Sequence, residues 1–215
     1  MAHNTIGSAK IAGTARLQKA GIETPALDAS LLLAAALNTS KTDIYTHPEK
    51  HITEAQMRRY ELFLQRREGG ECAAYVIGYK EFRRLKLHVT ADTLVPRADT
   101  ETLVEAVLDY IDGKTPQPKH LRLLDLCTGS GAVALALKQE RPFLNVYASD
   151  ISEAALQVAK QNAAEHSLEP VPKLGAGIAI ARNGAIASIW DAERRPKTHP
   201  YWLFGGGLGA RPTGR

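Results

Sequence analysis

Two groups of residues in this chain have types and a spacing suited to binding a ligand. The first is a run of small residues, namely Cys127, Thr128, Gly129, Ser130 and Gly131. The second is a single acid, Asp150, which follows Gly131 by 19 residues. Because glycine lacks a Cβ atom, such a run can turn tightly and let a ligand approach the backbone. A carboxylate at Asp150 can accept two hydrogen bonds from the hydroxyls of a ribose, so the pair predicts a ligand that contains this sugar.

The elements around these residues must bring the run and the acid to one edge of a sheet. Residues 121–126 and 144–149 are predicted strands, and residues of about 131–140 and 152–165 are predicted helices. Their order predicts an α/β fold with parallel strands, a right-handed crossover and burial of both strands on both faces. Asp125 ends the first strand, at the edge where open α/β sheets bind ligands.

The run of small residues is a weak signal when it is considered alone. It has neither the G-x-G-x-x-G spacing of a dinucleotide-binding fingerprint nor the Gly-Lys-Ser/Thr of a phosphate-binding loop. A turn that only packs a helix against a strand would have a similar composition. The complete order of strand, turn, helix, strand and acid is far more specific, and it favours the binding site.

The first seventy residues predict a small helical domain. Pro25 and Asn38 are typical of the first position and the end of a helix, and Thr53 with Gln56 forms a capping box before another. The apolar face of this second helix is predicted to consist of Met57, Tyr60, Leu62, Phe63 and Leu64. Its arginines are expected on a solvated face, namely Arg58, Arg59, Arg66 and Arg67.

The segment after this domain changes to the periodicity of a strand. Apolar and polar residues alternate over 85–89, which predicts a half-buried strand, and residues 75–79 are its candidate hairpin partner. A helix is expected from about residue 99 to Gly113, and a polar linker rich in proline follows at 114–120.

The composition, with 44% hydrophobic and 23% charged residues, is that of an ordinary soluble protein. The sequence has no run of 18 apolar residues and no signal-peptide core, so we expect a cytoplasmic location and no membrane partner. Cys72 and Cys127 lack paired spacing, which argues against a disulfide framework and against a metal site. Cys127 also has no recognisable histidine partner, so we interpret it as a loop residue and not as a nucleophile.

The net charge of +4 comes from the C-terminal end of the chain. Residues 1–170 have a balance of −1, whereas residues 171–215 hold seven Lys and Arg against two acids. A basic tail with Trp190, Tyr201 and Trp202 could bind single-stranded nucleic acid by charge and stacking. These aromatic and basic residues show no repeated spacing, so a nucleic-acid partner is not expected.

The stretch "LLDLCTGSGAVALAL", followed by "VYASDISEAALQVAKQNA", resembles the first half of class I S-adenosylmethionine-dependent methyltransferases. Upstream residues narrow the resemblance to bacterial release-factor N5-glutamine methyltransferases of the HemK type. That family carries a proline-arginine-x-acid-threonine-glutamate signature, which is matched here by Pro96, Arg97, Asp99, Thr100 and Glu101. The likeness covers about residues 1–170. It departs at 98–99, where Ala and Asp replace the usual proline and glutamate, and at Cys127, which is closer to the ribosomal-protein branch.

The resemblance implies a helical N-terminal domain at 1–72, a β-hairpin linker at 73–98, and the first half of a Rossmann-like domain at 99–170. It also implies transfer of a methyl group from S-adenosyl-L-methionine to a side-chain amide nitrogen, N5 of the glutamine in the Gly-Gly-Gln motif of peptide chain release factors. The run of small residues would line the amino-acid end of this cofactor, and Asp150 would bind its ribose hydroxyls.

The sequence after about residue 170 departs from the family. The Asn-Pro-Pro-Tyr motif that positions the acceptor amide is missing, and Thr198–Trp202 is its nearest likeness, so no catalytic residue is assigned. Residues 171–215 hold eight of the 17 glycines, and we expect an out-of-frame or foreign tail on a truncated enzyme. Poor solubility and weak cofactor binding should follow, because the strand at 121–126 would lack a neighbour along one edge. An inactive remnant, a ribosomal-protein glutamine methyltransferase and a nucleic-acid binder through the tail are the alternatives.

Sequencing of the coding DNA tests the expectation about the tail. The region downstream of codon 170 should contain an insertion, a deletion or a junction, because such a change alters the composition abruptly and leaves the preceding residues intact. A continuous and correct reading frame through this region would contradict the expectation.

Overall fold

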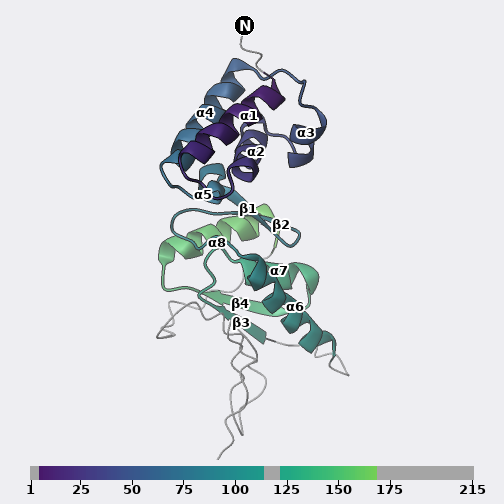
Figure 1. Cartoon of the computed structure of the whole chain (residues 1–215). Helices are drawn as coiled ribbons and strands as arrows, with labels where there is room; N and C mark the ends of the chain where they lie inside the picture. Colours follow the sequence, from purple (N-terminus) through teal and green to yellow (C-terminus); the bar gives the residue numbers. More distant parts are fainter. Residues whose placement is uncertain (1–4, 114–121, 169–215) are drawn as a thin grey trace, which may run out of the picture. The chain divides into compact units, whose positions relative to one another are not determined.

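The computed structural model describes residues 5–113 and 122–168 of the chain (Figure 1). The expected linker at 114–120 and the expected tail at 171–215 therefore lie outside the described residues. The chain forms two compact units with their boundary after Gly78, six residues beyond the expected end of the helical domain, and the hairpin belongs to the second unit. Within the described ranges, no helix has both the length and the apolar character that crossing a membrane requires.

The first unit is helical, as the sequence predicts. Its helices are α1 (Ile6–Lys19), α2 (Pro25–Leu37), α3 (Lys41–Thr46), α4 (Glu54–Glu68) and α5 (Ala73–Ile77). The interpretation of residues 75–79 as a strand is wrong, because α5 occupies most of them. Gly78 ends this helix in the left-handed conformation, at φ +90°, and its N–H group donates to the Ala74 carbonyl at 2.8 Å. The short helix therefore ends at a left-handed residue, and glycine is the residue that adopts this conformation most readily.

The expected ends of α2 and α4 are confirmed. In α4 the Gln56 N–H group donates to the Thr53 hydroxyl at 3.3 Å, and the Thr53 N–H group donates to the Gln56 side-chain oxygen at 3.0 Å. This reciprocal pair satisfies N–H groups that have no partner inside a helix. Helix α2 begins at Pro25 and ends at Leu37, and its C-cap Asn38 adopts the left-handed conformation at φ 53°.

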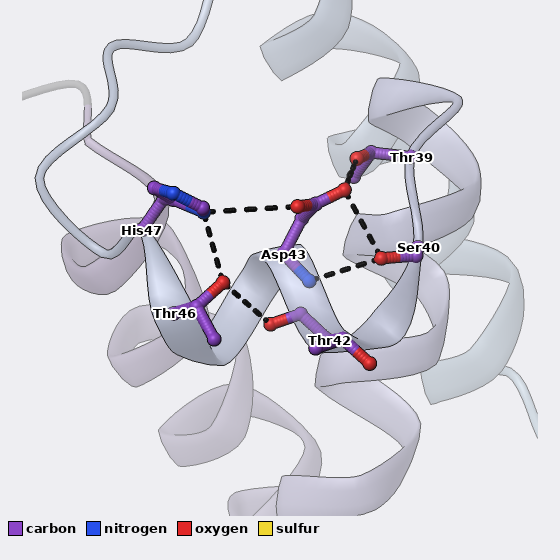
Figure 2. Close-up of polar contacts among 6 residues, drawn as sticks. All are labelled: Thr39, Ser40, Thr42, Asp43, Thr46 and His47. Atoms are coloured by element: carbon purple, nitrogen blue, oxygen red, sulfur yellow. Dashed lines mark hydrogen bonds and ion pairs between the residues drawn. The ribbon is translucent and has the colours of Figure 1, made fainter.

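The six-residue helix α3 is held by polar side chains at its surface, and Figure 2 shows them. The Asp43 N–H group donates to the Ser40 hydroxyl at 3.0 Å. The Asp43 carboxylate in turn accepts from the hydroxyls of Thr39, at 2.6 Å, and Ser40, at 3.0 Å. These hydrogen bonds, with that from Thr39 first, lower the pKa of Asp43. Because so short a helix has few internal hydrogen bonds, these side-chain hydrogen bonds contribute much of its stability.

Tyr60 is the largest fully buried side chain of the described residues, at 1% exposure. Its hydroxyl donates to the Ala29 carbonyl on α2 at 3.3 Å, and its burial raises its pKa. Gly13 on α1 faces the same ring, because a Cβ added at Gly13 would overlap the hydroxyl and lie 2.9 Å from the ring carbon Cζ. The missing side chain at Gly13 therefore lets α1 and α4 approach each other closely.

The predicted faces of α4 need two corrections. Tyr60 and Leu64 are buried as expected, but Leu62 is 59% exposed, because two residues along a helix lead to a different face. Arg67 is not solvated, since it forms an ion pair at 2.8 Å with the buried carboxylate of Asp28. Its neighbour Arg66 is exposed, as expected, like Arg58 and Arg59. Arg66 nevertheless donates to Glu71 and to backbone carbonyls of α5, so both Arg66 and Arg67 link elements of the unit.

The second unit combines a hairpin with an α/β arrangement. Its elements are β1 (Tyr79–Phe82), β2 (Leu85–His88), α6 (Ala98–Asp112), β3 (Arg122–Leu126), α7 (Ala132–Glu140), β4 (Asn145–Ser149) and α8 (Glu153–Glu165). Strands β1 and β2 pair in antiparallel fashion. Strands β3 and β4 pair in parallel, with Leu126 opposite Ser149, which confirms the predicted direction and makes both strands end at one edge. Among the described residues, β4 is the one strand that pairs with β3.

Helices α6, α7 and α8 lie on the same face of the β3–β4 sheet (Figure 1). On that face Leu123 and Val146 are buried in a core that includes residues of all three helices and of the hairpin. Leu124, Leu126 and Tyr147 belong to the other face, because side chains alternate along a strand, and they are half-buried. The prediction that both strands are buried on both faces is therefore wrong for the described residues.

The substitution Gly13→Ala tests the close approach of α1 and α4. We expect it to destabilise the protein by about 1–3 kcal/mol, since the new methyl group overlaps Tyr60 in a packed core. The double variant Gly13→Ala/Tyr60→Phe should recover part of this loss, because it removes the overlapping hydroxyl. Thermal and urea unfolding of the full chain, followed by circular dichroism, measures both effects.

The reverse exchange at the adjoining exposed position, Ala12→Gly, is the matched control. It should cost about 1 kcal/mol, because alanine is the better helix former wherever packing does not interfere. A protein stabilised by Gly13→Ala would contradict the packing described above.

Candidate functional site

The run from Cys127 to Gly131, hereafter the glycine loop, forms a tight turn at the carboxyl edge of the β3–β4 sheet. The Thr128 N–H group donates to the Ser149 carbonyl at 2.9 Å, and the Gly131 N–H group donates to the Thr128 carbonyl at 2.8 Å. Gly129 and Gly131 have φ values of +56° and +84°, in the region where glycine is favoured. A Cβ added at Gly129 would meet no atom within 4 Å, so this backbone is open to approach from outside.

Gly131, the N-cap of α7, meets a different constraint. A Cβ added there would lie 3.1 Å from a methyl group of Leu135 and 3.2 Å from the Cβ of Ala159 on α8. Glycine at this position therefore lets the loop pack against α8, whereas glycine at position 129 leaves open space. The two glycines of the loop have separate physical roles.

Cys127 adopts the left-handed conformation at φ +61°, which residues with a side chain rarely do. A glycine at this position would adopt the same conformation with less strain. The residue is exposed, yet partial burial of its sulfur and the nearby carboxylates of Asp150 and Asp125 raise the pKa of the thiol. A thiol with a raised pKa is a poor nucleophile at neutral pH, in agreement with its interpretation as a loop residue.

Asp125 lies inside the protein, at 3% exposure, and does not face outward from the strand end. Its Oδ2 atom accepts from the Thr128 hydroxyl at 2.8 Å and from the Ala134 N–H group at 3.2 Å. Burial raises its pKa to about 6, and the charge of Asp150 adds to this rise. Asp125 therefore fixes the glycine loop to the first turn of α7 and is not placed to contact a ligand.

Asp150 contacts the glycine loop directly. Its Oδ2 atom accepts from the Gly129 N–H group at 2.8 Å, and its Oδ1 atom accepts from the Ser152 N–H group at 2.9 Å, before the start of α8. The two predicted parts of the site, 19 residues apart in sequence, thus meet at the same edge of the sheet. Each carboxylate oxygen can accept a second hydrogen bond, so both remain able to bind a hydroxyl group.

The structure divides the predicted site residues into two groups. Cys127, Gly129 and Asp150 reach the surface. Thr128, Ser130 and Gly131 are buried and shape the backbone; the Ser130 carbonyl, for example, accepts a hydrogen bond from a side chain of α8. That side chain belongs to Asn162, which is not among the predicted site residues. The signal for it was present, because Asn162 interrupts the buried face formed by Ala155, Val158 and Ala163.

The geometry of the site is suited to holding a ligand. It offers an open backbone at Gly129 and a carboxylate at Asp150, and no ionisable group of the glycine loop has a lowered pKa that would mark an activated nucleophile. In the parts of the chain that the structure describes, no cluster of three or more His, Cys, Asp or Glu side chains is arranged to hold a metal ion.

Two family models match the chain. Residues 9–78 match the PrmC N-terminal domain, and residues 117–172 match a methyltransferase domain. The first match falls within the first unit, and the second includes the glycine loop and Asp150.

Curated relatives match over both regions. The release factor glutamine methyltransferase of Coxiella burnetii is 44% identical over 147 residues, which are 68% of this chain and 52% of the relative. The corresponding protein of Vibrio cholerae is 43% identical over 162 residues, 74% of this chain and 54% of the relative. That of Agrobacterium fabrum is 38% identical over 165 residues, 77% and 57% of the two chains. The chain therefore spans about half the length of the relatives that it matches.

The raised pKa of Asp125 predicts how stability depends on pH. Between the ordinary value of 3.8 and about 6, the folded protein binds more protons at this carboxyl than the unfolded chain does. The contribution of this carboxyl to the free energy of unfolding should therefore fall by about 3 kcal/mol as the pH rises through this window, and then level off. In Asp125→Asn this fall should disappear, since the amide oxygen can still accept from Thr128 and Ala134 and no charge is buried.

Urea unfolding of both proteins at a series of pH values measures the difference. The exposed Asp109→Asn on α6 is the control, and it should follow the wild-type dependence on pH. A constant difference in stability between Asp125→Asn and the wild type from pH 4 to pH 7 would show that this carboxyl does not titrate as described.

Proposed function

The chain belongs to the release factor glutamine methyltransferase family, and from this premise we propose that its second unit binds S-adenosyl-L-methionine at the glycine loop and Asp150. The contact of 2.8 Å between the Gly129 N–H group and the Asp150 carboxylate carries the proposal, because it brings the open backbone and the acid together. When bound, this cofactor supplies a methyl group on a positively charged sulfur.

The residues present fit such a ligand in two respects. Gly129 leaves room for close approach to the backbone, which suits the amino-acid end of the cofactor. Asp150 has a spare acceptor site on each oxygen, which suits the two hydroxyls of the ribose. Asp125 and the buried loop residues Thr128 and Ser130 would act indirectly, by holding the backbone in the conformation that these contacts need.

We further propose that the protein to which these residues belong methylates the side-chain amide of a glutamine in peptide chain release factors. The printed names of the relatives support this substrate, and the matched N-terminal domain supports the same assignment. Transfer of a methyl group from a sulfonium removes charge from the reacting centre, so positioning of the weak amide nucleophile contributes more than acid–base catalysis. The role of the described residues would be to bind and orient the donor.

Recognition of the ribose can be tested on the full chain by calorimetric titration with S-adenosylhomocysteine and with its 2′-deoxy analogue. The wild type should bind the ribose form about tenfold more tightly, because a hydrogen bond to a carboxylate contributes about 1.5–3 kcal/mol. Asp150→Asn should reduce this preference, since the substitution removes the charge and one of the acceptor oxygens.

The substitution Glu153→Gln is the matched control, because it removes an exposed negative charge from the first turn of α8 without touching the glycine loop. It should keep the preference for the ribose form. Equal binding of the two ligands by the wild type would refute the assignment of Asp150.

The acceptor is tested by incubating the full chain with labelled S-adenosyl-L-methionine and a release factor, and by locating the label. Label on a glutamine of the release factor supports the proposed substrate. Label on a ribosomal protein in a parallel reaction would favour the ribosomal-protein alternative, to which Cys127 is closer in sequence. A chain that binds the donor and labels neither protein would be an inactive remnant.

A further inference from the structure

Asn162 is fully buried on α8, and its side-chain amide uses both donors and its acceptor. The Nδ2 atom donates to the Ser130 carbonyl at 2.8 Å and to the His88 carbonyl at 3.0 Å. The Oδ1 atom accepts from the His88 N–H group at 2.7 Å. One side chain therefore links three elements that are distant in sequence: the hairpin strand β2, the glycine loop and α8.

The contact with β2 resembles the pairing of two strands. His88 lies at the end of β2, whose other edge pairs with β1, and Asn162 satisfies both of its outward backbone groups. At the C-cap of α8, the Nε2 atom of His166 lies 3.0 Å from the Lys86 carbonyl, two residues back along β2. Side chains of α8 and of its C-cap thus occupy the edge where another strand would otherwise bind.

The contact with Ser130 falls at a sensitive point of the glycine loop. The Ser130 carbonyl and the Gly131 N–H group belong to one peptide plane, and both of its ends are bonded. Asn162 holds the carbonyl, and the Thr128 carbonyl accepts from the N–H group at 2.8 Å. Because Gly131 is in the left-handed conformation, this plane sets the direction in which the chain enters α7.

We propose that Asn162 is a positioning residue of the donor site, which orients the glycine loop by joining Ser130 to the β1–β2 hairpin. The inference deepens the proposed function and rests on it, since the loop is taken to hold the donor. It implies that the conformation of the loop depends on the hairpin, although no residue of the hairpin belongs to the predicted donor site.

The chemistry of the amide makes this role specific. Asn162→Asp has almost the same shape, but an ionised carboxylate would place an oxygen against two carbonyl oxygens and could keep the bond from the His88 N–H group alone. Asn162→Gln keeps the amide and moves it by one methylene group. Val158→Ala, on the same buried face of α8, removes packing without removing a hydrogen bond to the loop, and it serves as the matched destabilising control.

The first measurement is amide hydrogen exchange, read residue by residue by nuclear magnetic resonance on the full chain without ligand. In Asn162→Asp, the amides of Gly131 and His88 should exchange at least tenfold faster than in the wild type, while those at the centres of β3 and α7 keep their rates. Val158→Ala should change the loop amides no more than the core amides. If Asn162→Asp does not fold, Asn162→Gln is measured in the same way, with the same expectation for the loop.

The second measurement is the affinity for S-adenosylhomocysteine. Asn162→Asp should weaken binding by at least tenfold, and Val158→Ala by less than twofold. The inference would be overturned if the exchange rates of the loop amides and the affinity changed only in proportion to overall stability, in the Asn162 variants as in Val158→Ala. A wild type that does not bind this ligand would count against the proposed function, whereas the exchange experiment would still decide the role of Asn162, so the two failures are distinguishable.

Discussion

The second unit depends on keeping a left-handed backbone at three of the five residues of the glycine loop, namely Cys127, Gly129 and Gly131. This conformation is unfavourable for residues with a side chain, and it turns backbone N–H and carbonyl groups away from regular partners. Each such group therefore needs a bond from elsewhere. The partners come from the edge of β4 through Ser149 and Asp150, and from α8. The conformation of these five residues thus depends on contacts with several other elements of the unit.

The buried acid in β3 belongs to the same requirement. Asp125 bonds the Thr128 hydroxyl and the first turn of α7, and these two bonds offset part of the cost of placing a carboxylate in the core. Its pKa nevertheless rises to about 6, so the offset is incomplete. The buried carboxylate therefore costs stability, but its hydrogen bonds fix the junction between β3, the glycine loop and α7. Acids and amides that look like ligand-binding groups in a sequence can therefore serve the backbone of a site and never touch its ligand.

The first unit meets its main constraint in the opposite way, by omitting a side chain. Gly13 removes the atoms that would collide with Tyr60, and two helices then pack closely without any special backbone conformation. The buried carboxylate of Asp28 is compensated by Arg67 of α4. Both features join elements that are distant in sequence, which local patterns do not reveal.

Much of the fold could be predicted from local sequence, because helix caps, strand alternation and loop composition act over a few residues. The capping box at Thr53, the left-handed end at Asn38 and the parallel strands beside the glycine loop are confirmed for that reason. The structure of residues 75–79 was harder to predict, since a pattern of five residues does not distinguish a strand from a helix. Most of these residues belong to the short helix α5, which ends before Gly78. Arg67 and Asn162 have partners 39 and 74 residues away. A local pattern can show that Asn162 interrupts an apolar face, but it cannot identify the partners of either residue.

The bond between His88 and Asn162 also imposes an order on synthesis. The hairpin leaves the ribosome first, and its outward peptide groups at His88 must remain in water until 74 further residues have been added. At ordinary translation rates this interval is about 4–15 s, far longer than a hairpin needs to form. The outer edge of the nascent hairpin therefore stays unpaired for several seconds. Helix α8 can bond to this edge only when the chain has been extended past the end of that helix.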